Sequence, residues 1–257
     1  MSTALYDRVI FGPIHSRRLG LSLGVNLLPL DHKLCSFDCI YCECGWGEKR
    51  EKVRFNDRET VRRELERKLT EMVEAGTPPD VITFAGNGEP TLHPDFGEII
   101  EDTIALRDRI APRAKVSVLS NATQIGRERV RAALLRVDNN ILKLDSAFDR
   151  TVRLVDRPRG NYSVAETVEN MKKFEGQLIV QTMFLRGEFE GKIVDNTTEE
   201  EVSAWLALIR EIAPRQVMVY TIDRSTPAEN LQKVTVEELK AIAARVEALG
   251  ITCSVAG

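Results

Sequence analysis

No apolar run in this sequence approaches the roughly 18 residues that a membrane-spanning helix needs. The first eight residues also lack the basic and then apolar layout of a secretion signal. These two absences argue against a membrane protein and against a secreted protein. We therefore expect a cytoplasmic protein with no membrane partner.

The chain also lacks a strong excess of charge of either sign. Its formal net charge is −3 over 257 residues, so no global basic field recruits nucleic acid. Charge is nevertheless uneven, because residues 107–159 hold thirteen Lys and Arg against six Asp and Glu, and residues 161–257 hold ten against fifteen. The basic stretch is either a set of solvated helix faces or a docking surface for a phosphate-bearing partner.

Histidine and cysteine are scarce, with three and five residues, and the histidines have no mutual spacing that suggests a metal site. Four of the five cysteines, however, fall within ten residues, from Cys35 to Cys44. A cytosolic chain does not use such a cluster as a disulfide framework. The spacing points to a metal site instead.

Short apolar strands alternate along the chain with amphipathic helices. We expect strands at 21–28, 80–85, 115–120, 140–145, 178–184 and 216–221, helices at 57–75, 95–110, 127–136, 164–174 and 199–212, and a final helix at 236–249 followed by a strand at 251–255. The strands are continuous apolar runs, which suits a parallel sheet covered by helices. Six βα units imply an open or closed α/β barrel, or a doubly wound sheet.

Capping residues mark the ends of several expected helices. The N-caps are Asp57, Thr198 and Thr235, the last with Glu238 in a capping-box pattern. Glycines stand where helix C-caps are expected, at positions 76, 176 and 250. No linker or composition shift divides the chain, so we expect one domain over residues 1–257.

The cysteine loop follows the first expected strand, and Cys35, Cys39 and Cys42 have C-x3-C-x2-C spacing. Thiolates this close together can converge on one metal centre. Zinc needs four ligands, usually as two spaced pairs, and remains an alternative if Cys44 or His32 supplies the fourth. A cubane iron–sulfur cluster takes one thiolate per iron, so three cysteines would leave one iron open to a substrate.

This spacing, with Tyr41 before the third cysteine, resembles the defining motif of radical S-adenosylmethionine (SAM) enzymes. The resemblance implies a 4Fe–4S cluster on Cys35, Cys39 and Cys42, whose open iron chelates the amino and carboxylate groups of SAM. It also implies reductive cleavage of SAM to a 5′-deoxyadenosyl radical in an oxygen-sensitive enzyme. Tyr41 is then expected near the adenine.

A second segment, Gly86, Asn87, Gly88, Glu89 and Pro90, resembles the Gly-Gly-Glu-Pro segment of that family, with asparagine in place of the second glycine. The resemblance implies that its backbone and its acidic residue bind the amino group of SAM. Glycines let a backbone approach a ligand closely, and a carboxylate can meet a cation. The alternative is a plain Gly-Pro turn between a strand and a helix.

Polar residues end the third and fourth expected strands. The resemblance places Ser120 and Asn121 near the ribose or carboxylate of SAM, although they could instead cap the following helix. Lys143 and Asp145 lie two residues apart and so share one face of their strand. Two charges on a buried strand face are costly unless paired or used, so they are either substrate-side residues or a structural ion pair.

The last two strands of the expected barrel add three candidates. Gln181 and Thr182 point to opposite faces, so one of them faces the barrel interior, and we prefer Gln181. Asp223 and Arg224 follow the last strand, where such barrels place their chemistry, and are substrate-side candidates.

The block at 11–24, together with the cysteine loop and residues 221–227, resembles the branch grouped with wyosine-type tRNA synthases. In this block Arg17 and Arg18 could meet phosphate or a substrate carboxylate, or they could clamp the cysteine loop. Relatives that modify tRNA carry an additional cluster or extra segments. Cys44 and Cys253 are the only cysteines left for one, and Cys253 has the character of an ordinary buried strand cysteine.

The resemblance implies a partial (β/α)6 TIM-like barrel with a core at about 20–222, an N-terminal extension at 1–19 and a C-terminal helix and strand at 235–255. It also implies flavodoxin or ferredoxin as the electron donor. Three functions stay open: modification of a tRNA base, radical modification of a peptide, small molecule or partner enzyme, and a non-catalytic iron–sulfur or zinc protein.

Overall fold

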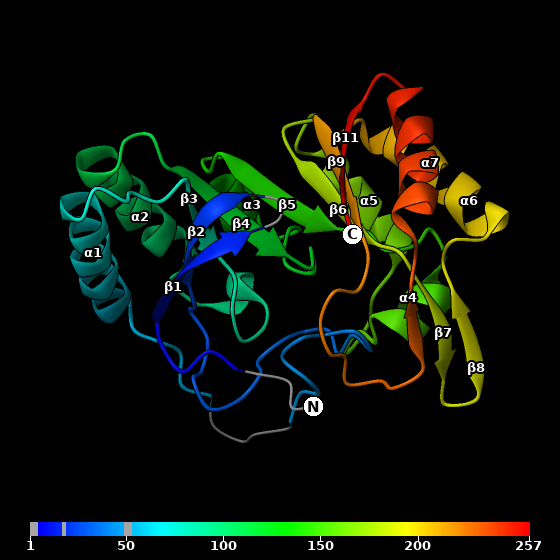
Figure 1. The fold of residues 1–257 in the computed structure, drawn as a ribbon, viewed down its shortest axis with the longest axis horizontal. Helices are drawn as coiled ribbons and strands as arrows, with labels where there is room; N and C mark the ends of the chain where they lie inside the picture. Colours follow the sequence, from blue (N-terminus) through cyan, green and yellow to red (C-terminus); the bar gives the residue numbers. More distant parts are fainter. Residues whose placement is uncertain (1–4, 17–18, 49–52) are drawn as a thin grey trace.

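An eight-stranded sheet is the centre of the computed structural model, which describes residues 5–16, 19–48 and 53–257 (Figure 1). The strands follow the spatial order β1 (Ile10–Ser16), β2 (Gly20–Val25), β3 (Val81–Phe84), β4 (Lys115–Ser120), β5 (Asn139–Lys143), β6 (Ile179–Met183), β9 (Gln216–Tyr220) and β11 (Thr252–Ala256). β1 pairs antiparallel with β2, and every pairing from β2 to β11 is parallel. The sheet is curled into a half-barrel, which confirms the predicted partial (β/α)6 barrel.

Helices cover one face of this half-barrel. They are α1 (Arg58–Glu74), α2 (Phe96–Ile110), α3 (Glu128–Leu134), α4 (Asp149–Val155), α5 (Val164–Lys172), α6 (Glu199–Ile212) and α7 (Val236–Glu247). Figure 1 shows α1 and α2 at one end of the sheet and α6 and α7 at the other. Across the described ranges, no helix is both long and apolar enough to cross a bilayer.

Strand residues alternate between the two faces of the sheet. One set, including Val118, Leu142 and Val180, joins the main core beneath the helices. The alternate set forms a small apolar cluster on the concave face, with Ile141, Ile179 and Met218. Because successive side chains point to opposite faces, Lys143 and Gln181 continue the concave set toward the C-terminal strand ends.

The side chains of Thr182 and its neighbour Gln181 point to opposite faces of the sheet. The Thr182 hydroxyl donates to the Leu144 carbonyl at 2.8 Å and accepts from the indole of Trp205 on α6 at 3.1 Å. Thr182 therefore faces the helices and Gln181 the barrel interior, as the strand pattern predicts.

The predicted caps form as expected. The side chains of Asp57 and Thr198 accept backbone hydrogen bonds at the starts of α1 and α6, and Thr235 forms a full capping box with Glu238. The glycines at 76, 176 and 250 all have positive φ just beyond their helices. Local sequence therefore determines these helix boundaries.

Four strands and one α-helix were not predicted from the sequence. β1 lies within the expected N-terminal extension and contains the Gly12–Pro13 pair, which interrupts its pattern. The seven-residue α4 is too short to show a clear helical period. The other three are the strands of a separate small sheet, in which the hairpin of β7 (Leu185–Phe189) and β8 (Lys192–Asp195) pairs with β10 (Leu231–Lys233).

Candidate active site

The cysteine loop leaves β2 and is fixed on one side to the segment that follows β3. The Leu34 amide donates to the Asn87 carbonyl at 2.8 Å, and the Glu89 amide donates to the Leu34 carbonyl at 3.0 Å. Gly88 lies between these bonds with φ +138°, and a Cβ placed there would be 1.8 Å from the Leu34 carbonyl oxygen. Glycine is therefore required at position 88 because the backbone before Cys35 passes directly over it.

The other side of the loop is fixed to the C-terminal end of α4. The Asp38 amide donates to the Asp156 carbonyl, and the Ile40 amide donates to the Val155 carbonyl, both at 2.9 Å. The loop thus bridges segments that follow β3 and β5, at the end of the sheet where the parallel strands terminate. This location agrees with the expected position of the site.

Lys33 is the central cation of the loop. Its side chain is buried, and Nζ donates to the Gly45 carbonyl at 2.9 Å and to the Asp38 carboxylate at 3.2 Å. Burial alone would lower the pKa of Lys33, but the thiolates of Cys42, Cys35 and Cys39 and the Asp38 carboxylate raise it overall. All three predicted cluster ligands therefore lie within electrostatic reach of one buried ammonium group.

The three thiols differ in acidity. A hydrogen bond from Cys44 is the largest cause that lowers the pKa of Cys42 to about 5. Burial, followed by the Glu89 carboxylate, raises the pKa of Cys35 to about 12, and burial raises that of Cys39 well above its ordinary value. Two of the three groups are thus stable as thiolates only when a positively charged centre offsets their burial.

The donor set of three thiols from one loop fits a cubane that takes one thiolate at each of three irons. Among the described residues, no three His, Cys, Asp or Glu side chains are grouped as a single metal ion requires. A cubane binds each thiolate at a separate iron, so its ligands need not converge on one point. Cys44 donates to the Gly86 carbonyl at 3.2 Å, and Cys253 lies on the edge strand β11, which leaves Cys35, Cys39 and Cys42 as the candidate ligands.

Glu89, Ser120 and Asn121, all predicted to contact SAM, are in direct contact with one another. The Glu89 carboxylate is buried and accepts from the Ser120 hydroxyl at 2.9 Å and from the Asn121 amide at 2.6 Å. Burial raises the pKa of Glu89, and these hydrogen bonds oppose the shift. The Asn121 side-chain amide reaches the Cys35 sulfur at 3.5 Å, so this cluster touches the cysteine loop.

Asn87, another predicted SAM contact, has a structural role in the described residues. Its buried side chain donates to the carbonyls of Tyr6 and Pro29, both at 2.8 Å, and accepts from the Tyr6 amide. Both amide hydrogens are therefore used within the chain. The neighbouring Gly86 lies close to Asn26, whose side chain an added Cβ would meet at 2.6 Å, and Pro90 begins a short 3-10 helix at 90–92.

Lys143 and Asp145 form an ion pair of 3.0 Å, and the pair extends to Tyr41. The Tyr41 hydroxyl donates to the Asp145 carboxylate and accepts from Lys143. Burial would lower the pKa of Lys143, but Asp145 and Asp156 raise it well above its ordinary value. The structure therefore contains the structural ion pair that was one of the two sequence interpretations, and it adds the aromatic residue of the cysteine motif.

Asp156 is a site residue that sequence reasoning missed. It is buried at the C-terminal end of α4, accepts from the Cys39 thiol at 3.2 Å and lies 3.5 Å from Lys143. Burial, together with the Asp145 carboxylate, raises its pKa to about 7. No motif or spacing in the sequence distinguishes it, because its role depends on where α4 packs.

The remaining substrate-side candidates lie in different places. Gln181 pairs in register with Lys143 on the concave face. Asp223 and Arg224 are exposed at the rim, where Asp223 lies 3.6 Å from Lys233 and Arg224 lies 2.7 Å from Glu43 of the cysteine loop.

Arg17 and Arg18 lie outside the described residues. Among the described residues, Arg224 forms an ion pair with Glu43 of the cysteine loop at 2.7 Å. This contact is of the type that the sequence suggested for Arg17 and Arg18.

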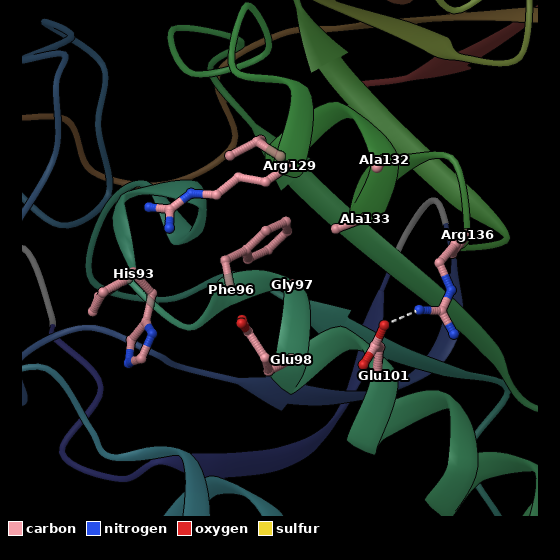
Figure 2. Close-up of a pocket in the computed structure, with 11 residues that line it drawn as sticks. His93, Phe96, Gly97, Glu98, Glu101, Arg129, Ala132, Ala133 and Arg136 are labelled. Carbon is pink, nitrogen blue, oxygen red and sulfur yellow. Dashed lines mark hydrogen bonds and ion pairs between the residues drawn. The ribbon is translucent and has the colours of Figure 1, made fainter.

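A pocket of about 290 Å³ lies apart from this site, between α2 and α3 (Figure 2). An ion pair between Glu101 and Arg136 closes one end of it. None of the predicted site residues lines this pocket. It therefore belongs to the helical exterior and not to the cysteine loop.

The family model of the radical SAM superfamily matches residues 32–197 of the chain. A UPF0026 protein from Methanocaldococcus jannaschii is 30% identical over 242 residues, which cover 92% of this chain and 70% of that protein. The chain belongs to the radical SAM superfamily of enzymes and, within it, to the UPF0026 proteins. A protein named GTPase Obg from Brachyspira hyodysenteriae is 29% identical over 240 residues, but the chain spans only 33% of its length.

Solved structures share the fold at low identity. A radical SAM methyltransferase from Sphaerobacter thermophilus superposes with a TM-score of 0.69 at 15% identity, covering 91% of this chain and 65% of that one. A structure of TYW1 with a lysine–pyruvate adduct bound gives a TM-score of 0.61 at 14% identity, covering 88% of this chain and 73% of that one. At such identities the likeness shows the half-barrel fold alone.

Proposed function

We propose that Cys35, Cys39 and Cys42 hold a 4Fe–4S cluster and that the protein uses it to cleave SAM reductively. The observation that carries this proposal is a loop with three thiols that is held by the buried Lys33 ammonium, which bonds to Asp38 and to the Gly45 carbonyl. With cluster and SAM bound, one electron cleaves SAM to methionine and a 5′-deoxyadenosyl radical, which takes a hydrogen atom from the substrate. The protein supplies orientation and exclusion of water.

The chain's own residues fix the geometry of the loop. Lys33 precedes the cysteine motif and bonds to Asp38 within it and to the Gly45 carbonyl just beyond it, so these three parts of the loop are held together. Gly88 admits the backbone that precedes Cys35, and on the opposite side the Asp156 carbonyl accepts from the Asp38 amide at 2.9 Å. We propose that SAM lies between these two supports, where Asn121 and the backbone of residues 86–90 can reach it.

For the substrate we propose a base of a transfer RNA, on the resemblance of residues 11–24 and 221–227 to the wyosine-type branch. The basic stretch at 107–159 gives this proposal limited support. Arg107 pairs with Asp138 at 2.8 Å, and other arginines of the stretch also have carboxylate partners, among them Arg109, Arg136 and Arg150. Most of that local excess is therefore neutralised within the fold.

A second candidate is radical modification of a peptide, a small molecule or a partner enzyme. The net charge of −3 and the pairing of the arginines favour it, because neither provides the counter-charge that a nucleic acid needs. A tRNA substrate predicts binding with a steep salt dependence, whereas the second candidate does not.

The lysine–pyruvate adduct named for TYW1 raises the question of a reactive lysine in this chain. Lys143 is the lysine on the concave strand face, and its ammonium is held by Asp145, Asp156 and Tyr41. These partners keep it charged, and a charged amine is not a nucleophile. We therefore assign Lys143 to positioning Tyr41 and not to covalent chemistry.

Anaerobic reconstitution with iron and sulfide, followed by dithionite and SAM, tests the proposed activity. We expect 5′-deoxyadenosine and methionine in equal amounts from the wild-type protein and neither above background from Cys39→Ala. Cys253→Ala, on the edge strand β11, is the matched control and should cleave normally. A wild-type protein that carries a full cluster yet releases no 5′-deoxyadenosine would contradict the proposal. Profiling of modified nucleosides and metabolites in a deletion strain then addresses the substrate.

A further inference from the structure

A groove of about 610 Å³ lies on the outer surface between α4 and the β7–β8 hairpin. Its lining consists of Arg150, Thr151, Arg153, Leu154, Arg157, Phe189, Glu190, Lys192 and Ile193. Four of these residues are basic and one is acidic, although the chain as a whole has a net charge of −3. The groove is therefore a local positive surface on a weakly acidic protein.

Part of this positive charge is not neutralised within the chain. Arg150 pairs with Glu200 at 2.7 Å, and Arg157 lies 3.5 Å from Glu190. Within the ranges that the structure describes, neither Arg153 nor Lys192 has a carboxylate within 4.0 Å. These two cations are available to an acidic partner.

The groove also exposes apolar surface. Ile193, on β8, has 84% of its surface exposed. Trp46, which is 40% exposed, lies outside the lining but its ring is 5.8 Å from that of Phe189. The Arg157 guanidinium lies 5.0 Å from the ring centroids of both Trp46 and Phe189. Apolar groups ringed by cations are typical of a surface that binds another protein.

The groove lies directly behind the cysteine loop. One face of α4 contributes Arg153 and Leu154 to the groove, while the carbonyl of the adjacent Val155 accepts from the Ile40 amide of the loop at 2.9 Å. Asp156, which contacts Cys39, immediately precedes Arg157. A single short helix therefore separates this surface from a proposed cluster ligand.

We propose that this groove is the docking surface for an acidic protein that carries single electrons. The proposal rests on the proposed function, because it assumes a cluster on Cys35, Cys39 and Cys42. One electron leaves the reduced carrier and is gained by the oxidised cluster, and no bond between heavy atoms forms or breaks. The electron donor must come close to the cluster, because electron transfer slows steeply with distance. It should also approach from outside the barrel, because the concave face must stay open to the substrate.

An RNA is the competing occupant of a basic and aromatic surface. Two observations favour a protein. Ile193, which is 84% exposed, is aliphatic and offers no stacking surface for a base, and the rings of Trp46 and Phe189 already lie 5.0 Å from the Arg157 guanidinium. In addition, the groove lies behind α4, whereas a substrate must reach the concave face on which Lys143 and Gln181 lie.

Reduction of the reconstituted enzyme by flavodoxin hydroquinone tests the proposal, with cluster bleaching followed by stopped-flow absorbance. The test variant is Arg153→Glu with Lys192→Glu, and the control is Arg113→Glu, an exposed cation in the loop before β4 at the opposite end of the strands. We expect the second-order rate constant at low salt to fall about tenfold or more in the double variant. The effect should shrink as salt is added, and the control should match the wild type. Titration with oxidised flavodoxin should show the same loss in affinity.

Dithionite provides the arm that separates this proposal from the proposed function. Because dithionite needs no docking surface, the double variant should be reduced by it, and should then cleave SAM, at the wild-type rate. If dithionite reduces the wild-type cluster without cleaving SAM, the proposed function fails while the flavodoxin measurements still decide the docking site.

Two outcomes would overturn the docking proposal. One is equal reduction by flavodoxin in the double variant and in Arg113→Glu, and the other is a loss of RNA binding in the double variant with unchanged reduction by flavodoxin. Ile193→Asp tests the apolar part separately, since a side chain that is 84% exposed can be changed without disturbing the core. It should weaken flavodoxin binding and leave the cluster content unchanged.

Discussion

The Cys39 sulfur lies 3.2 Å from the Asp156 carboxylate, although the two residues are 117 positions apart in the sequence. Asp156 also lies 3.5 Å from Lys143, which donates to Tyr41 of the cysteine motif. The contact therefore joins a proposed cluster ligand to the strand that lines the concave face. It makes the position of the cysteine loop depend on the packing of α4, and several expected outcomes follow from that arrangement.

Single replacement of each candidate ligand should separate ligands from bystanders. Cys35→Ala, Cys39→Ala and Cys42→Ala should each lose nearly all iron and sulfide after reconstitution, since a cubane held by two thiolates is labile. Cys44→Ala should keep its cluster, because the Cys44 thiol is directed to the Gly86 carbonyl, to which it donates at 3.2 Å. Iron and sulfide analysis with absorbance spectra measures this. Loss of iron from Cys44→Ala as complete as that from Cys42→Ala would make Cys44 a ligand.

Removal of the Lys33 charge should lower the reduction potential of the cluster. Opposite unit charges within about 8 Å interact by about 2 kcal/mol at an effective dielectric constant of about 20. Lys33→Gln removes that stabilisation of the added electron, whereas Lys33→Arg keeps it. A spectroelectrochemical titration measures the shift, with Lys240→Gln on the exposed face of α7 as the control. An unchanged potential in Lys33→Gln would show that the ammonium only holds the loop.

Gly88→Ala should destabilise the protein more than an ordinary glycine replacement. Its Cβ would be 1.8 Å from the Leu34 carbonyl oxygen, so the loop before Cys35 must move. Gly250→Ala is the matched control, since φ is +79° there and no atom lies within 4 Å of the added Cβ. Urea unfolding should show a loss of about 1 kcal/mol for the control and more than about 3 kcal/mol for Gly88→Ala. Equal losses would mean that the contact with the loop does not constrain this position.

Asp156 should make the cluster-free protein less stable as the pH rises from about 4 to about 7. Its pKa is raised to about 7 in the fold, so the folded state binds the proton more tightly than the unfolded state over that range. The slope from one such group reaches about 1.4 kcal/mol per pH unit. Asp156→Asn stays neutral and should flatten the profile of unfolding free energy.

The comparison of those two profiles isolates the carboxyl group. The pKa of Cys42 is lowered to about 5, so that thiol adds stability with rising pH above about 5, and the sign is opposite. Subtracting the Asp156→Asn profile from that of the wild type cancels the contribution of Cys42. Parallel profiles from pH 4 to 7 would contradict the assigned shift.

The sequence determined the repeating architecture and the motif. Continuous apolar strands, amphipathic helices and capping residues such as Asp57 and Thr235 are local signals, and they specified a parallel α/β architecture and most helix boundaries. The choice of a partial barrel over a doubly wound sheet came from the family resemblance. The spacing of three cysteines with Tyr41 identified the superfamily because the motif lies within eight residues. Glu89 was selected from the resemblance of residues 86–90 to a family segment and Ser120 and Asn121 from the end of a strand, and the three are in contact in the structure.

Only the tertiary structure decided which distant groups meet at that motif. Asp156 joined the site because α4, too short to predict, packs its C-terminal end against the cysteine loop. The Asn87 side chain bonds to Tyr6 and Pro29, and Gly88 packs against the backbone of Leu34. No local sequence pattern encodes these contacts. Strand and helix patterns arise from interactions between near neighbours in the chain. Charge pairing and close backbone contact depend on segments that only folding brings together.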